Sequence, residues 1–220
     1  MLKNYEEKQV EVREKIKTLL EGLISANKLV LKSLDTCDKS KIDEAKKHVS
    51  NMSKKTSDVD NEIIATLALH QPEAKDLREL VSFLKITNEI LRASFNTRSF
   101  INGFKEVCED IDIKIVKEYA IPMQKATVKA LDGAYEMLCI DCTDESRDTY
   151  NKVLINENKT DDMYDLIEKD LLKEGKKGGE FKKIHEMLGA LRKSEKIADR
   201  ALGIASLLLY AKVGGELHQL

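Results

Sequence analysis

The chain of 220 residues is poor in residues that interrupt regular structure, with only two prolines and ten glycines. All-β folds need turn residues about every 8–12 positions, so this scarcity argues against an all-β fold and favours a few long helices. No apolar run approaches the roughly 20 residues that span a bilayer, and residues 1–15 lack the apolar core of a signal peptide. We therefore expect a soluble, cytoplasmic protein.

The chain also lacks an excess of charge of one sign. Its 37 Lys and Arg residues stand against 39 Asp and Glu residues, which gives a net charge of −2. Without a global positive field, the protein is not expected to bind nucleic acid or an anionic membrane surface. Hydrophobic residues make up 42% of the chain, which is enough for a packed core and too much for disorder.

Cysteines are few, at positions 37, 108, 139 and 142, and too scattered for a disulfide scaffold, which fits a reducing compartment. Cys139 and Cys142 have CxxC spacing, but a zinc site would need a second ligand pair, which Cys37 and Cys108 would have to supply. A thioredoxin-like site would need a βαβ context that the sequence lacks. The favoured interpretation is four free cysteines that pack as small buried hydrophobes.

Hydrophobic periodicity of the helical kind covers nearly the whole chain. Short polar or proline-containing breaks divide it, and Pro122 stands either in the first turn of a helix or at a kink. The expected helices cover residues 4–34, 40–69, 73–104, 109–140, 144–173 and 181–212.

The two halves of the chain repeat the same plan of three long helices. In each half a short polar break near a cysteine follows the first helix, and a sharper break, at 70–72 or 175–179, follows the second. A repeat of about 105 residues indicates a duplicated helical bundle, not a solenoid. We expect an all-α fold of two tandem three-helix bundles, with domains at residues 1–106 and 107–220.

Acidic residues recur at helical spacing in the second half. Glu195 and Asp199 lie four apart, as do Glu157, Asp161 and Asp165 on the preceding helix, so each set projects from one helix face. If the two helices pack antiparallel, the carboxylates can converge, and they then repel each other unless protonated or bridged by a cation. Oxygen ligands suit Mg²⁺, Mn²⁺, Ca²⁺ or iron.

A plainer interpretation is a solvated acidic face, neutralised by neighbours such as Lys193, Lys196 and Arg200. Catalysis finds little support, because nucleophile-elbow, Walker and Rossmann motifs are absent. A carboxylate-bridged metalloenzyme usually adds a Glu-x-x-His pair, yet the nearest histidine, His185, precedes Glu195 by ten residues. We expect a protein that is not an enzyme.

Several short strings, in their order along the chain, resemble the PhoU family of phosphate-uptake regulators over nearly the whole chain. The last helix contains Glu195-x-x-x-Asp199, which is similar to the family's Glu-x-x-x-Asp signature. The other similar strings are Ala68–Pro72, Asp76–Arg78, Leu84–Ile86, Thr160–Tyr164 and Leu209–Glu216.

The resemblance implies tandem three-helix bundles, a homodimer, and a non-enzymatic regulator that couples a phosphate ABC transporter to a sensor histidine kinase. A paralogue serving another phosphate permease, or a metal-free scaffold, is the alternative. The resemblance also implies a divalent or trivalent metal ion, such as iron, zinc, manganese, magnesium or calcium. Asp161, Glu195 and Asp199 match family ligand positions, and Asp165 extends the same acidic stripe.

The first half departs from the family pattern. Leu91, Phe95 and Ser99 stand where the family has Glu, Asp and Asn, and Ser53 stands at a metal-site aspartate. Leucine and phenylalanine cannot ligate a cation and are expected to turn that face into core. In the second half Gly203 replaces the expected Asn. We therefore predict one metal site at most, in the second half.

Overall fold

The computed structural model describes residues 2–111, 113–173 and 179–215. Every regular element of these residues is helical, as predicted, and no helix among them is long and apolar enough to cross a bilayer. Most of the expected glycine linker, 175–178, lies outside the described residues. The elements are α1 (Leu2–Ser33), α2 (Lys39–His48), α3 (Met52–His70), α4 (Ala74–Val107), α5 (Ile113–Ile115), η1 (Val116–Ala120), α6 (Ile121–Cys139), α7 (Thr143–Lys173) and α8 (Gly179–Val213).

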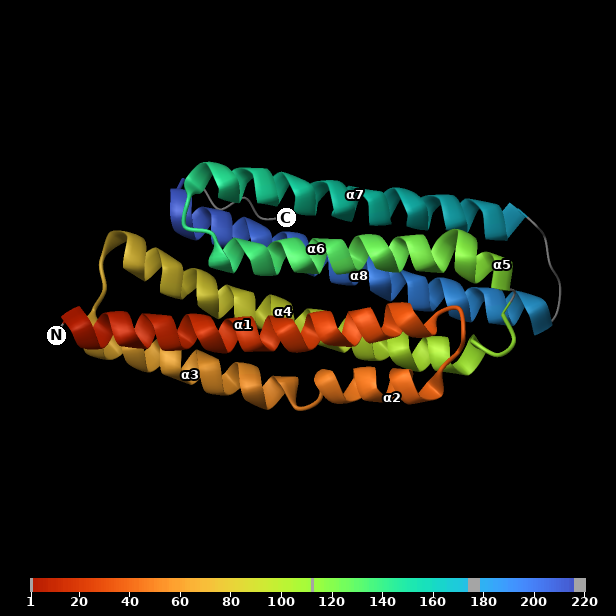
Figure 1. Cartoon of the computed structure of the whole chain (residues 1–220), viewed down its shortest axis with the longest axis horizontal. Coiled ribbons are helices and arrows are strands. Elements are labelled where there is room, and N and C mark those ends of the chain that lie inside the picture. The colour runs from red at the N-terminus through yellow and green to blue at the C-terminus, as the bar shows by residue number, and fades with distance from the viewer. Residues whose placement is uncertain (1, 112, 174–178, 216–220) are drawn as a thin grey trace.

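The helices form two trios that lie side by side along the length of the molecule (Figure 1). One trio is α1, α4 and the pair α2–α3, and the other is α6, α7 and α8. The most extensive contact joins the trios, between α4 and α8, and α1 also packs on α6. The fold of tandem three-helix bundles is thus confirmed. The proposed domain division at residues 106 and 107, beside the end of α4, stays a prediction.

The second expected helix, 40–69, is in fact two helices, α2 and α3, separated at Val49–Asn51. Two local features end α2: the Ser50 hydroxyl donates to the Lys47 carbonyl at 2.7 Å, and Asn51 takes a left-handed conformation with φ 56°. Such side-chain bonds compete with helical ones, and Asn tolerates this backbone region. The end of α2 packs closely on α1 beside this break. A Cβ added at Gly22 of α1 would stand only 3.1 Å from the His48 carbonyl oxygen.

Pro122 occupies the first turn of α6, one of the two positions that the sequence left open. The π-helical turn η1 immediately precedes it. Because proline lacks an N–H, it is tolerated in a first turn. The expected helix 109–140 therefore begins four residues late and contains an irregular first segment.

The cysteines depart from the expectation that all four are free and buried. Cys37, in the break after α1, and Cys108, beside the end of α4, form a disulfide with a Cα–Cα separation of 5.5 Å. Cys139 and Cys142 are free, but both are exposed. Because Cys37 and Cys108 bond each other, they are not available to complete a zinc site with the CxxC pair.

A buried hydrogen-bonded network connects the two trios, and we call it the interbundle network. Gln124 of α6 donates to the Asn27 side-chain oxygen of α1 at 2.9 Å and accepts from the Ser194 hydroxyl of α8 at 2.7 Å. Asn27 donates to Thr97 of α4 at 3.1 Å, and Thr127 lies 3.0 Å from Ser194. All five residues are at most 1% exposed, so the network satisfies polar groups that water cannot reach.

Candidate metal centre

Three carboxylates from α7 and α8 converge in the second trio. Glu157 and Asp161 of α7 and Asp199 of α8 each offer one oxygen, and these oxygens all lie within 4.8 Å of one another. Glu157 is buried, Asp161 is exposed and Asp199 is intermediate. We call these three residues the carboxylate cluster. Its composition and spacing suit a hard cation that prefers oxygen ligands.

Helix geometry explains why these residues meet. Glu157 and Asp161 are four apart on α7, so their side chains lie one turn apart on a single face. The helix α8 packs against α7 and brings Asp199 to that face. The cluster therefore depends on the contact between α7 and α8, which local sequence alone does not set.

Glu195 does not join the oxygens of the cluster, although it is 97% buried with 3% exposure. Its Oε1 lies 3.0 Å from the Lys196 ammonium, and its Oε2 is 3.4 Å from Arg192 Nε. Oε2 is buried and has no hydrogen-bond partner among the described residues. Basic neighbours on its own helix thus hold this carboxylate.

Lys196 also lies beside the cluster. Its ammonium is 2.8 Å from Asp199 Oδ2 as well as 3.0 Å from Glu195 Oε1. The ammonium therefore bridges these two carboxylates and supplies one positive charge where a metal ion would supply two or three. Any bound cation has to displace or share this ion pair.

The sequence-predicted set and the cluster overlap only in part. Asp161 and Asp199 are brought together, whereas Glu195 is held by Lys196 and Arg192, and Asp165 is exposed and outside the cluster. Glu157 was absent from the predicted set. Its signal was present in the sequence, as the residue one turn before Asp161.

The cluster strongly disfavours negative charge on Glu157. Burial, with the negative charges of Asp161, Asp199 and Glu195 as further causes, raises the pKa of Glu157 to about 7. Burial also raises the pKa of Glu195, against the opposing effect of Lys196. A carboxyl that is half protonated near neutral pH is one that a cation would deprotonate on binding.

We expect the metal-free protein to lose stability as the pH rises from about 4.5 to about 7. The pKa of Glu157 is higher in the folded protein than in the unfolded protein. The neutral carboxyl therefore contributes its full share of stability below the unfolded-state pKa, and this share is lost as the pH rises through the folded-state pKa. The loss is on the order of 2 kcal/mol. Urea unfolding across this window, in chelator, measures it.

Glu157→Gln should flatten this pH dependence, because the variant has no charge to desolvate. Asp165→Asn is the matched control, since Asp165 is an exposed carboxyl on the same helix, and it should keep the wild-type slope. Equal slopes for wild type and Glu157→Gln would contradict the assignment.

The family ligand positions of the first half hold no acidic side chain. Leu91 is half-buried against the core, but Phe95 is 47% exposed, and Ser53 and Ser99 are exposed. The expectation that this face becomes core is therefore wrong for Phe95. The ring stays in solvent because α4 turns this position away from its packed neighbours.

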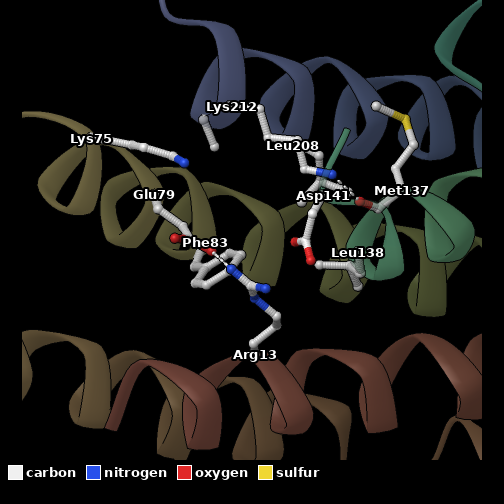
Figure 2. A pocket seen from close by; sticks show the side chains of 10 residues that line it. Arg13, Lys75, Glu79, Phe83, Met137, Leu138, Asp141, Leu208 and Lys212 are labelled. Carbon is white, nitrogen blue, oxygen red and sulfur yellow. Dashed lines mark hydrogen bonds and ion pairs between the residues drawn. The ribbon is translucent and has the colours of Figure 1, made fainter. Parts of the chain in front are cut away.

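A polar cavity of 210 Å³ lies at the junction of the trios, and we call it the junction cavity. Figure 2 shows three of its charged groups engaged: Arg13 of α1 pairs with Glu79 of α4, and the Lys212 ammonium of α8 lies 2.7 Å from the Met137 carbonyl. Lys212 also donates to the Ile140 carbonyl and to Ser146 Oγ. All three ammonium hydrogens are thus used, two on carbonyls at the end of α6 and one on Ser146 in the first turn of α7, which assigns Lys212 a structural role.

Comparisons with known proteins agree with this architecture. Residues 16–95 match the family model described as the PhoU domain. The crystal structure of PhoU from Pseudomonas aeruginosa is similar with a TM-score of 0.75 and 18% identity, covering 97% of this chain and 98% of that one. The phosphate transport system regulatory protein PhoU from Streptococcus pneumoniae is similar with a TM-score of 0.79 and 16% identity, covering 98% and 100%.

No curated protein sequence matches the chain. The family match and the structural similarities confirm the resemblance inferred from the sequence. Residues 16–95 match the PhoU domain, and the fold is similar to that of PhoU over nearly the whole chain.

Proposed function

We propose that this protein is a non-enzymatic regulator of phosphate uptake that works in the cytoplasm. It docks on a phosphate transporter, either the ATPase of an ABC transporter or another phosphate permease, and on a sensor histidine kinase. The observation that carries the proposal is the PhoU-domain match at residues 16–95. The similarity to a phosphate transport system regulatory protein along the whole chain supports it.

Exposed apolar side chains on α3 and α4 support a docking role. Ile64 and Leu69 of α3 are 55% and 78% exposed, and Phe95 of α4 is 47% exposed. Leu77 and Val81, on the first turns of α4, are also exposed. Amphipathic helices that leave apolar side chains in solvent suit contact with a partner helix. The same side chains would be available for contact in a homodimer.

We further propose one cation site, held by Glu157, Asp161 and Asp199. A divalent or trivalent ion there would neutralise the repulsion that raises the Glu157 pKa. The oxygen donors fit iron, manganese, magnesium or calcium better than a structural zinc ion. At the matching positions of the first half, leucine, phenylalanine and serine supply no carboxylate.

A metal-free scaffold is the second candidate, and one observation favours it. The Lys196 ammonium already bridges Glu195 and Asp199, so the site contains a cation of its own. In that case the acidic residues serve the packing of α7 on α8, and regulation proceeds by docking alone.

Affinity capture with the full chain tests the docking proposal. Wild type should recover a transporter subunit or a histidine kinase from cells grown with and without phosphate. The variants Ile64→Gln and Phe95→Gln should lose most of this recovery. Val10→Gln is the matched control, because Val10 is 60% exposed on α1, and it should behave as wild type. Recovery of neither partner, or equal recovery by all variants, would overturn the proposal.

A further inference from the structure

A second cavity lies between α7 and α8, with a volume of 410 Å³, and we call it the α7–α8 cavity. Tyr164 and Glu168 of α7 line one side, and Gly189, Arg192 and Lys193 of α8 line the other. The volume is within the range of sites for small organic ligands, roughly 300–1,000 Å³. Neither the carboxylate cluster nor the junction cavity shares a lining residue with it.

Arg192 is held in place on two sides. The centre of its guanidinium lies 4.8 Å from the centroid of the Tyr164 ring, a cation–π contact. Its Nε lies 3.4 Å from Glu195 Oε2, and Glu195 is the carboxylate that pairs with it among the described residues. The two terminal amino groups of the guanidinium are therefore left for a ligand, already oriented as a flat fork.

Lys193 adds a second cation to the same cavity. It is half-buried, and no carboxylate of the described residues pairs with it. Glu168, which opposes these charges, is exposed, as is Arg192, so water and salt screen both of them more than they screen Lys193. The cavity thus presents two cations with unused donors against one screened carboxylate, and His185 is a further lining residue.

The remaining wall leaves room for an organic group. Leu188 is 7% exposed and forms an apolar wall. Gly189 has no side chain, and a Cβ added there would meet nothing within 4 Å. The space beside the two cations is therefore open at Gly189 and not filled by protein.

We propose that the α7–α8 cavity binds a small phosphate-bearing anion through the guanidinium of Arg192 and the ammonium of Lys193. A planar guanidinium that offers two parallel N–H donors, beside a second cation, matches a doubly charged phosphate better than a single carboxylate. Inorganic phosphate and small phosphate monoesters share this chemistry. The site does not depend on the regulatory role or on metal in the carboxylate cluster.

Calorimetric titration of the full chain with inorganic phosphate and with glycerol phosphate, at constant ionic strength, tests the proposal. Saturable binding with a Kd of about 1 mM or tighter is expected for at least one probe. Arg192→Gln and Lys193→Gln should each weaken it by about tenfold or more. Arg147→Gln is the control, since Arg147 is an exposed arginine in the first turns of α7, away from the cavity, with Asp144 at 3.9 Å. This variant should bind as wild type does.

Gly189→Leu keeps the test independent of unfolding. Leucine favours a helix over glycine, and the position has space for a Cβ, so the variant should fold with unchanged or higher thermal stability. The variant should lose binding of glycerol phosphate. A smaller loss of affinity for inorganic phosphate would place the organic group of the ester beside Gly189. No saturable binding of either probe by wild type, or full binding by Gly189→Leu, would overturn the proposal.

Discussion

Replacing Gln124 with methionine is expected to lower the free energy of unfolding by about 3 kcal/mol. Methionine has a similar length and keeps the volume filled, but it neither donates to Asn27 nor accepts from Ser194. Both partners are at most 1% exposed, so water cannot replace the lost bonds at 2.9 and 2.7 Å. An unsatisfied buried polar group costs about 1–3 kcal/mol.

Chemical denaturation measures this loss of stability. In thermal unfolding, the midpoint temperature should fall by about 8 °C. Asn61→Leu serves as the control, because Asn61 is exposed on α3 and its replacement should change stability little. A double-mutant cycle of Gln124→Met with Ser194→Ala should show coupling, since the two residues share one hydrogen bond. Additive effects, or a Gln124→Met protein as stable as wild type, would mean that the network does not stabilise the contact between the trios.

Adding a hard divalent cation is expected to stabilise the protein at a pH above about 7. There the folded-state carboxyl of Glu157 is mostly ionised, and a cation in the carboxylate cluster neutralises the repulsion among Glu157, Asp161 and Asp199. A ligand that binds only the folded state at 100 times its Kd contributes about 2.7 kcal/mol. Thermal unfolding with a panel of Mn²⁺, Fe²⁺, Ca²⁺, Mg²⁺ and Zn²⁺, against chelator, measures it.

Two variants separate a metal site from a general salt effect. Asp199→Asn should abolish the stabilisation and the bound metal found by elemental analysis, because the cluster loses a charged ligand. Lys196→Gln should increase metal affinity, since the ammonium 2.8 Å from Asp199 Oδ2 no longer competes. Asp165→Asn, outside the cluster, should respond as wild type does. A panel without any cation-dependent shift in wild type or in Lys196→Gln would favour the metal-free scaffold.

Local sequence signals were sufficient for most of the helical architecture. The side chain of Asp38 caps α2 by accepting from the backbone of Ser40 and Lys41, and Pro122 stands in a first turn. Each of these features depends on residues only a few positions apart, so it can be recognised from the sequence alone. The break at Val49–Asn51 was missed because its Ser and Asn interrupt a periodicity that continues on both sides.

The sequence by itself determined that the protein is helical, that its two halves each contain a bundle of three helices, and that acidic side chains recur one turn apart on α7 and α8. Only the tertiary structure decided which carboxylates meet, with Glu157 brought to Asp199 while Glu195 faces Lys196 and Arg192. It also decided that Cys37 pairs with Cys108. The physical reason is that spacing along one helix sets which side chains share a face, whereas the rotation and register of a packed neighbour set what that face meets.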